Sequence, residues 1–284
     1  MTAFKIKKKI KLDFENSVSL VSFNEVHTVC EESKCPNRYE CSSNHTATFL
    51  IAGDICTRNC AFCNVKTGRP LPLEETREKE MEAVIEAVKK TNMKYVVLTS
   101  VTRDDDEEGL AGYFALLTRK LKELGCMVEM LIPDFHSNEK YLEIILNAKP
   151  NVIAHNIETV SKYSKSIRPQ AAYITSLATL HKIKEIDDAM ITKSSFLAGL
   201  GESFDEINQL MVDLKNAGVN IFMIGQYLRP SAKQTEVKKI YDEKEFTRLQ
   251  KMANQAQFDH VEAGTFVRSS YRAHEVYLKL LEKK

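Results

Sequence analysis

The sequence predicts one parallel α/β domain, and three observations lead to this prediction. Apolar, strand-like runs alternate with helical patterns along most of the 284 residues, and such alternation is typical of parallel strands joined by right-handed crossovers. The length suits one α/β barrel or a large α/β domain with short extensions. Apolar residues make up 43% of the chain, which is enough for a sizeable core.

Three strands and three helices are expected in the first half of the chain. Residues 46–52 form an apolar run that stops at Gly53 and Asp54, a turn signal. Residues 74–90 carry apolar side chains at helical spacing, and Gly125 is a typical stop for the following helix. The remaining elements here are a strand at 94–100, a helix at 107–124, a strand at 127–132 and a helix at 138–148.

The second half of the chain continues the alternation. Ser203 and Glu206 have the spacing of a capping box, which opens a helix, and Gly218 closes that helix. The six strand–helix units contain no internal repeat or low-complexity segment. The strands of this half are expected at 152–157, 190–200 and 220–225, and the helices at 172–183, 203–217 and 243–257.

Charge and hydropathy argue against several classes of protein. Lysine and arginine number 40 against 39 acidic residues, a net charge of +1, which does not suit a general binder of nucleic acids or membrane surfaces. No apolar run approaches the roughly 18 residues that a bilayer span needs. The basic residues 5–11 are not followed by a hydrophobic signal core. We therefore expect a cytoplasmic protein with no nucleic-acid or membrane partner.

The cysteines are clustered. Seven are present, and six of them lie between residues 30 and 63. Clustered cysteines in the cytosol are more often metal ligands or redox groups than disulfides, whereas the lone Cys126 is expected to be a small buried apolar residue. The six form two triplets: Cys30, Cys35 and Cys41 with C-x4-C-x5-C spacing, and Cys56, Cys60 and Cys63 with C-x3-C-x2-C spacing.

Iron–sulfur clusters fit these triplets better than zinc does. Zinc ribbons use paired C-x2-C elements that give four ligands, and neither triplet provides that pairing. Three thiolates on a short loop suit one face of a cubane cluster and leave one iron for another ligand. A single zinc site built from four of the six cysteines is the alternative.

The second triplet belongs to a recognisable motif. Residues 56–63 read CTRNCAFC, and this spacing, with an aromatic residue before the last cysteine, resembles the signature of radical S-adenosylmethionine enzymes. The resemblance implies that Cys56, Cys60 and Cys63 hold a 4Fe–4S cluster that binds S-adenosylmethionine and cleaves it to a hydrogen-abstracting 5′-deoxyadenosyl radical. It also implies a partial (β/α)6 TIM-like barrel, with the chemistry at the carboxyl ends of the strands.

The first triplet and seven sequence blocks narrow the resemblance to the lipoyl synthase family. The blocks occur in the family's order from about residue 30 to residue 273. The chain departs from the family pattern at Ala61, Asn64, Thr102 and residues 262–265, and none of these changes removes a cluster ligand. The blocks are LTSVTRDD at 98–105, PDF at 133–135, HNIETV at 155–160, RP at 168–169, GLGE at 199–202, IGQYLRPS at 224–231 and VRSSYRA at 267–273.

This resemblance implies a sulfurtransferase. Such an enzyme inserts sulfur at carbons 6 and 8 of an octanoyl chain bound to a lipoyl carrier domain, which gives the lipoyl cofactor. A second, auxiliary 4Fe–4S cluster on Cys30, Cys35 and Cys41 would be consumed as the sulfur donor. The RSSY segment (residues 268–271) would supply its serine ligand, assigned to Ser270 with Ser269 as the alternative. Oxygen is poorly matched to iron–sulfur chemistry, so this ligand could leave when the cluster is dismantled.

Five residues in the family blocks are assigned to binding S-adenosylmethionine. Alternatives stay open for three of them: Gly199 could serve only a tight turn, and Asn156 and Glu158 could contact either ribose or substrate. Of their neighbours, Arg168 could be structural or could contact product, and His155 is expected to be a packed, hydrogen-bonded histidine. The five assigned residues are Thr99, Asn156, Glu158, Gly199 and Gln226.

The resemblance also implies three parts and several partners. Residues 1–45 would be an extension that carries auxiliary-cluster ligands, residues 46–260 the radical core, and residues 261–284 a segment and helix that close over the barrel. Expected partners are octanoylated domains of the glycine cleavage H protein or 2-oxoacid dehydrogenase E2 type, an electron donor such as ferredoxin or flavodoxin, and iron–sulfur cluster carriers. The rival classes are another radical enzyme, such as one with biotin-synthase-like sulfur insertion, and a non-enzymatic zinc or ferredoxin-type protein.

Overall fold

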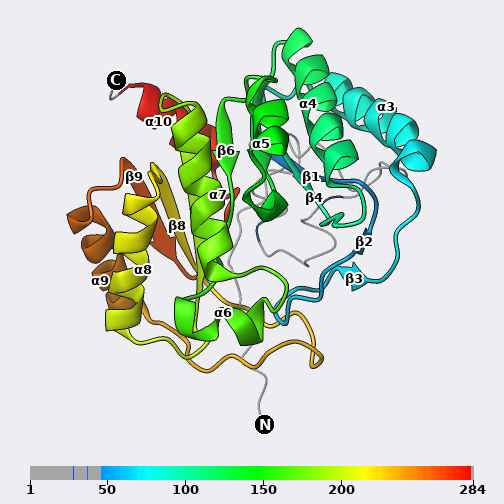
Figure 1. Cartoon of the computed structure of the whole chain (residues 1–284). Coiled ribbons are helices and arrows are strands. Elements are labelled where there is room, and N and C mark those ends of the chain that lie inside the picture. The colour runs from blue at the N-terminus through cyan, green and yellow to red at the C-terminus, as the bar shows by residue number, and fades with distance from the viewer. Residues whose placement is uncertain (1–27, 29–36, 38–45, 283–284) are drawn as a thin grey trace.

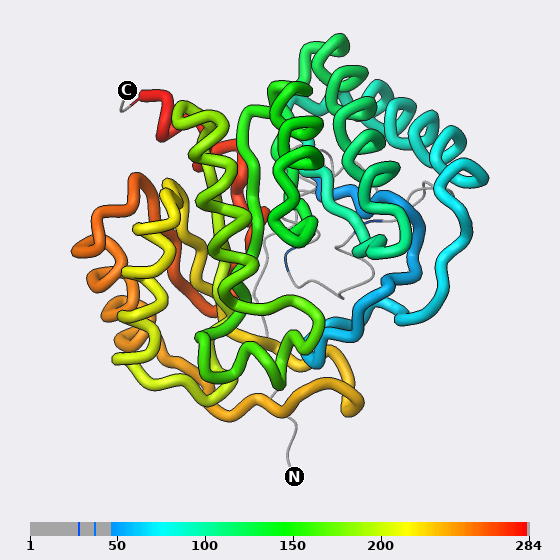
Figure 2. Tube along the Cα trace, viewed as in Figure 1, coloured from blue at the N-terminus to red at the C-terminus, as the bar shows by residue number. Residues whose placement is uncertain are grey.

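An all-parallel sheet forms the centre of the molecule. The computed structural model describes Thr28, Asn37 and residues 46–282. In this part of the chain seven strands pair in the order β1-β4-β5-β6-β7-β8-β9, and the edge strands β1 and β9 do not pair with each other, so the barrel is partial (Figures 1 and 2). The strands are β1 (Thr46–Ile51), β4 (Tyr95–Ser100), β5 (Met127–Leu131), β6 (Val152–Ala154), β7 (Thr192–Ala198), β8 (Ile221–Gln226) and β9 (His260–Gly264).

Helices cover the outer face of this sheet (Figure 1). None of the helices within residues 46–282 is both long and apolar enough to cross a bilayer. A separate parallel pair, β2 (Ile55–Cys56) and β3 (Lys66–Thr67), flanks the cysteine loop. The helices are α3 (Leu73–Thr91), α4 (Glu107–Glu123), η2 (Phe135–Ser137), α5 (Glu139–Leu146), α6 (Ser161–Ile167), α7 (Tyr173–Ile186), α8 (Phe204–Asn216), α9 (Glu243–Gln255) and α10 (Ala273–Leu281).

The predicted α/β fold class is confirmed, with seven strands where the sequence indicated six. The additional strand β9 pairs with β8 and extends across residue 260, where the core was expected to end. The three-part division of the chain itself stays a prediction. The predicted capping box is present, since the Ser203 side chain accepts from the Glu206 backbone and the Glu206 side chain accepts from the Ser203 backbone.

Two apolar cores lie between the sheet and its helices. Strand side chains alternate between the two faces, and in β1 Phe49 and Ile51 are fully buried in a core that α3, α4 and α5 share. Phe196 and Phe222, from β7 and β8, belong to a second core with α8 and α9. Cys126 is buried as expected. The other set of strand side chains is left to line the barrel interior.

Helix α10 closes the amino end of that interior. Its Tyr277 packs in one apolar cluster with Tyr95, Val152 and Ile221, which are the first residues of β4, β6 and β8. The Tyr95 ring also stacks on His274, with the ring centroids 5.4 Å apart. This packing anchors the RSSY segment, which directly precedes α10.

An ion pair is buried inside the barrel. The Nζ of Lys193, on β7, lies 2.9 Å from Oε1 of Glu129, on β5, and the two side chains are 0% and 1% exposed. The Tyr95 hydroxyl donates to the other carboxylate oxygen at 2.9 Å. The carboxylate is therefore satisfied on both oxygens, which a buried charge requires.

Candidate active site

The residues singled out from the sequence gather at the carboxyl ends of the parallel strands. Loops that follow parallel strands converge at one rim, so chemistry is concentrated there. Cys56 is the last residue of β2, beyond the end of β1. Thr99 lies at the end of β4, Asn156 follows β6, and Gly199 directly follows β7. Residues more than 140 positions apart in sequence thus share one rim.

The cysteine loop (residues 56–63) presents three free thiols. The Cys56 sulfur accepts two backbone N–H groups, from Arg58 at 3.4 Å and from Thr102 at 3.3 Å. The backbone N–H of Cys63 donates to the carbonyl of Cys60 at 3.0 Å, which closes a tight turn. Amide donors aimed at a sulfur stabilise its thiolate form, so this loop is suited to metal ligation.

Burial and mutual repulsion disfavour the thiolate forms of Cys60 and Cys63. Burial raises the pKa of Cys60, Arg168 opposes this rise, and the negative charges of Cys63 and Cys56 add to it, so that the pKa reaches about 11. Burial also raises the pKa of Cys63, and the charge of Cys56 adds to this. Thiolates that interact in this way repel one another unless a cation binds between them. The donor set fits three irons of a cubane cluster, each held by one cysteine.

Backbone contacts hold the cysteine loop from two directions. The N–H of Ala61 donates to the carbonyl of Ile167 at 2.8 Å, and the carbonyl of Ala61 accepts from Thr235 at 2.8 Å. The side chain of Gln234 donates to the carbonyl of Cys63 at 3.1 Å. The last residue of α6 and the segment after β8 therefore fix the position of the second half of the cysteine loop.

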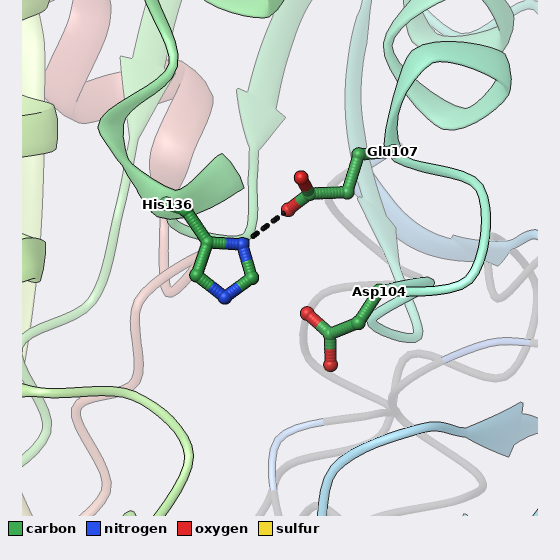
Figure 3. A group of neighbouring side chains, drawn as sticks. All are labelled: Asp104, Glu107 and His136. Atoms are coloured by element: carbon green, nitrogen blue, oxygen red, sulfur yellow. Dashed lines mark hydrogen bonds and ion pairs between the residues drawn. The ribbon is translucent and has the colours of Figure 1, made fainter.

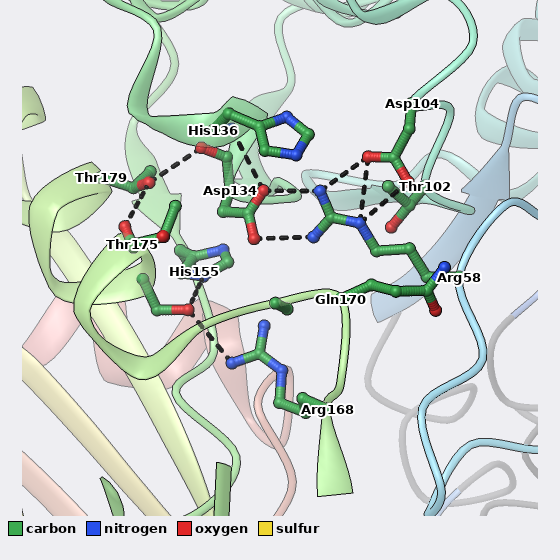
Figure 4. A network of polar contacts seen from close by, with 12 residues as sticks. Arg58, Thr102, Asp104, Asp134, His136, His155, Arg168, Gln170, Thr175 and Thr179 are labelled. Carbon is green, nitrogen blue, oxygen red and sulfur yellow. Dashed lines mark hydrogen bonds and ion pairs between the residues drawn. The ribbon is translucent and has the colours of Figure 1, made fainter. Parts of the chain in front are cut away.

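Arg58 fixes the first half, and the sequence alone did not reveal this role (Figure 4). Its guanidinium lies between two carboxylates, with Nη2 2.7 Å from Oδ1 of Asp104 and Nη1 2.7 Å from Oδ2 of Asp134. Burial opposes ionisation of Asp134, but the hydrogen bonds and charge of Arg58, together with His155 and the N–H of His136, outweigh it and lower the pKa of Asp134 to about 2. The guanidinium is thus paired on both sides, with the buried Asp134 and the partly exposed Asp104, and Arg58 ties the cysteine loop to the ends of β4 and β5.

Asp104 also belongs to an exposed cluster with Glu107 and His136 (Figure 3). Nδ1 of His136 lies 2.8 Å from Oε1 of Glu107, and the Asp104 carboxylate accepts from Arg58 and from the Thr57 hydroxyl. The carboxylates therefore have partners within the chain, and we interpret this cluster as a charged edge of the Arg58 network.

The side chains of His155 and Arg168 hydrogen-bond backbone groups near the rim (Figure 4). His155 is 2% exposed, and its two ring nitrogens bond the Ile132 carbonyl and the Ser176 hydroxyl, both at 2.9 Å. Burial, with a smaller contribution from Arg168, lowers the pKa of His155 to about 4. It is the packed, hydrogen-bonded histidine that the sequence predicted. Arg168 donates to the carbonyls of Asn156 and Ile157 at 3.1 and 3.0 Å.

The five residues assigned to S-adenosylmethionine all lie at this rim, with different surroundings. The Thr99 hydroxyl donates to the Leu131 carbonyl at 3.0 Å. Gly199 has a φ of +110°, and a Cβ there would lie 2.4 Å from the Lys239 carbonyl oxygen. This backbone position therefore requires glycine, whether or not the nucleotide contacts it. Gln226 is fully buried, and its amide bonds backbone groups on both ends. Their role toward the nucleotide stays a prediction.

The two serines of the RSSY segment have different partners. The Ser269 hydroxyl donates to Oδ1 of Asn156 at 2.9 Å. The Ser270 oxygen accepts from the hydroxyl of Thr48, on β1, at 2.8 Å. Nδ2 of Asn37 donates to the carbonyl of Phe266, just before the segment, at 2.6 Å. The predicted auxiliary-cluster cysteines lie outside the described residues: Cys30, Cys35 and Cys41.

A family model places this site in a known class. The model described as the radical SAM superfamily matches residues 50–225, which is more than half of the chain. The match covers the cysteine loop and the strands from β4 to β8. The fold and the site therefore define a radical S-adenosylmethionine domain.

Similar sequences identify the family within this superfamily. The lipoyl synthase of Rubrobacter xylanophilus is 46% identical over 252 residues, which cover 88% of this chain and 78% of the relative. The lipoyl synthase of Picrophilus torridus is 45% identical over 284 residues, 98% of each chain. The chain belongs to the lipoyl synthase family, and the prediction of a radical sulfurtransferase enzyme is confirmed. Membership implies a 4Fe–4S cluster and S-adenosylmethionine as cofactors and lipoyl carrier proteins as substrates.

Solved structures agree on the fold. The hydrogenase maturase HydG has a TM-score of 0.59 and 16% identity, covering 83% of this chain and 54% of its own. Methylornithine synthase (PylB) has a TM-score of 0.54 and 14% identity, covering 83% of this chain and 81% of its own. At these identities the likeness shows the fold alone.

Proposed function

We propose that this chain inserts two sulfur atoms, at carbons 6 and 8, into an octanoyl chain that is amide-linked to a lysine of a lipoyl carrier domain. Membership in the lipoyl synthase family supports the reaction. The observation that carries the proposal is the position of Ser270. Its loop lies against β1 and contacts Asn37, which stands between Cys35 and Cys41 in the sequence. The contact places Asn37 beside the RSSY segment, as a cluster site shared by these two parts of the chain requires.

The proposal assigns two cubane clusters. Cys56, Cys60 and Cys63 hold the first, and the second is held by Ser270 together with the first cysteine triplet of residues 30–41. When bound, the first cluster supplies the electron that cleaves S-adenosylmethionine, and the second supplies the sulfur. The three-part division into residues 1–45, 46–260 and 261–284 is part of the same proposal, although β9 joins the last two parts in one sheet.

The chain's own contribution is positioning and exclusion of water. A primary carbon radical reacts with any C–H bond in reach, so substrate and nucleotide must be held in one geometry. The bridge from Arg58 to Asp104 and Asp134, together with the backbone contacts of Ala61, keeps the cysteine loop in place. Because α10 closes the amino end of the barrel, we propose that the octanoyl chain enters from the carboxyl end. No acid–base pair is needed for the key step.

The proposed macromolecular partners follow from this substrate. They are octanoylated carrier domains of the glycine cleavage H protein or 2-oxoacid dehydrogenase E2 type. A one-electron donor such as ferredoxin or flavodoxin would reduce the first cluster. Iron–sulfur cluster carriers would rebuild the second cluster after each turnover, since its sulfur is consumed.

The experiment is an anaerobic incubation of the purified enzyme with S-adenosylmethionine, a reductant and an octanoylated carrier peptide. We expect the peptide to gain the mass of two sulfur atoms, and 5′-deoxyadenosine to form. Iron analysis should give about eight irons per chain if both sites hold cubanes. Formation of 5′-deoxyadenosine with no sulfur in the peptide, at full iron content, would contradict the proposed reaction. The Cys60→Ala variant serves as the inactive control.

A further inference from the structure

The cysteine loop forms part of a strongly basic surface, which we call the basic face. Three segments make up this face: residues 57–70, residues 161–170 in and after α6, and residues 227–241 after β8 (Figures 1 and 2). Together they contain ten lysines and arginines against one acidic residue, Glu236, whereas the whole chain has 40 basic and 39 acidic residues. Positive charge is therefore concentrated around the cysteine loop in an otherwise nearly neutral chain.

The segments of the basic face are joined through the cysteine loop itself. The N–H of Ala61 donates to the carbonyl of Ile167, and the N–H of Thr235 donates to the carbonyl of Ala61, both at 2.8 Å. Asn59 is exposed and directly precedes Cys60. A protein that binds the basic face therefore approaches to within one residue of a predicted cluster ligand.

Several cations of the basic face are available to a partner. Arg58 and Arg168 are buried, and the other eight are exposed. Within the described residues, Lys165 and Lys233 form no ion pair, and the Arg229 guanidinium donates only to backbone carbonyls. Surface ion pairs are weak, so lysines that form them can exchange a neighbouring carboxylate for one of a partner. Four lysines of the face have such a neighbour: Lys66, Lys162, Lys238 and Lys239.

We propose that the basic face docks an acidic one-electron carrier protein, which reduces the cluster held by Cys56, Cys60 and Cys63. The inference rests on the proposed function, since it names the docking surface of the electron donor proposed there. In each transfer the donor loses one electron and the cluster gains it, and no bond between the two proteins forms or breaks.

Position favours an electron donor over a lipoyl carrier domain as the partner at this face. A carrier domain must pass its octanoyl chain into the barrel interior, whereas a reductant needs only a short distance to the cluster. The basic face includes the cysteine loop, so it offers that short distance. Weak redox complexes have small interfaces, and opposite charges speed and orient their encounters. A face with a few available lysines is sufficient for such a complex.

The first test measures binding of a purified acidic flavodoxin to the holoenzyme. The double variant Lys165→Glu, Lys233→Glu should raise the Kd about tenfold or more, because two attractive charges become repulsive. The control Lys89→Glu, Lys251→Glu makes the same change in net charge at exposed sites of α3 and α9, and should alter the Kd less than about twofold. Equal weakening in both double variants, or wild-type binding that does not weaken as salt is raised, would overturn the inference.

The second test compares two reductants by the rate of 5′-deoxyadenosine formation. With limiting reduced flavodoxin, the double variant Lys165→Glu, Lys233→Glu should be about tenfold slower than wild type at equal iron content. With dithionite, a small reductant that needs no docking face, the two enzymes should have the same rate. An equally slow reaction with dithionite would assign the defect to the cluster site and overturn the inference.

Two further outcomes separate this inference from its alternatives. A raised KM for the octanoylated carrier domain in the Lys165→Glu, Lys233→Glu variant, with an unchanged response to flavodoxin, would assign the basic face to the carrier domain and overturn the inference. A wild-type enzyme that forms 5′-deoxyadenosine with reduced flavodoxin but inserts no sulfur refutes the proposed function instead, and the docking result then stands on the binding and reductant tests.

Discussion

Asn37 donates a hydrogen bond from Nδ2 to the backbone carbonyl of Phe266 at 2.6 Å, across 229 residues of sequence. Asn37 is 1% exposed, so this contact is part of the folded interior rather than a surface encounter. Phe266 lies four residues before Ser270, and Asn37 stands between two cysteines of the first triplet. The contact supports the proposal that both ends of the chain contribute to one auxiliary site.

Ser270→Cys should separate cluster binding from sulfur release. Thiolate matches iron better than a hard oxygen does, so we expect both clusters to assemble and cleavage of S-adenosylmethionine to persist. Sulfur insertion should fall by about tenfold or more, because roughly 1.4 kcal/mol of added barrier gives each factor of ten. Mass spectrometry of the carrier peptide measures the loss. Wild-type turnover in Ser270→Ala would remove Ser270 from the ligand set.

Replacing Cys56, Cys60 and Cys63 together with Ala should abolish formation of 5′-deoxyadenosine. The variant loses the three thiols of the cysteine loop, and about half of the iron should remain, on the auxiliary site. Chromatography of the nucleoside product and iron analysis check the two expectations. Cleavage of S-adenosylmethionine by this variant would show that another site generates the radical.

Lys193→Met should destabilise the protein strongly. Of its two hydrogen-bonding partners among the described residues, Glu129 would retain the Tyr95 hydroxyl alone in the barrel interior, and breaking a buried pair costs about 3–5 kcal/mol. Chemical denaturation measures the loss, and Lys251→Met, on the exposed face of α9, should change the free energy of unfolding by less than about 0.5 kcal/mol. The double variant with Glu129→Leu should recover most of the loss. If Lys193→Met lowered the free energy of unfolding no more than Lys251→Met does, the ion pair would not contribute to stability.

Asp134→Asn should make the stability less sensitive to acid. The pKa of Asp134 is lowered to about 2 in the folded protein from 3.8, so ionised Asp134 stabilises the fold above about pH 4. This stabilisation is lost as the pH falls from about 4 to 2, and the shift corresponds to about 2 kcal/mol. The difference in unfolding free energy between wild type and Asp134→Asn should therefore shrink over this range. A difference that is constant with pH would mean that Arg58 does not favour the ionised form.

Local patterns in the sequence were sufficient to predict most of the fold. Alternation of apolar runs with helical faces predicted the strands from β4 to β8, since burial on both faces makes parallel strands continuously apolar. The capping box at Ser203 could be predicted because its hydrogen bonds join residues that are three positions apart in sequence. Strand β9 escaped prediction because its sequence, HVEAG, carries His260 and Glu262 on one face and does not look like a buried strand.

The contacts that arrange the site could not be predicted in the same way. The cysteine spacing identified the thiols, but the partners of Arg58 lie 46 and 76 residues away. The contact between Ser269 and Asn156 depends on how the C-terminal segment enters the barrel, and no local pattern encodes that path. Gln226 was assigned to the nucleotide from its family block, and only the fold reveals that its amide already bonds backbone groups.

The central claim is that sulfur comes from a cluster on the first cysteine triplet and Ser270. The most direct measurement is a single turnover by enzyme whose clusters contain a heavy sulfur isotope, in buffer with unlabelled sulfide, followed by mass spectrometry of the carrier peptide. We predict that both inserted sulfur atoms are heavy. The Cys30→Ala, Cys35→Ala, Cys41→Ala triple variant should cleave S-adenosylmethionine but insert none. Unlabelled sulfur in the wild-type product, or any dithiolated product from the triple variant, would contradict the account.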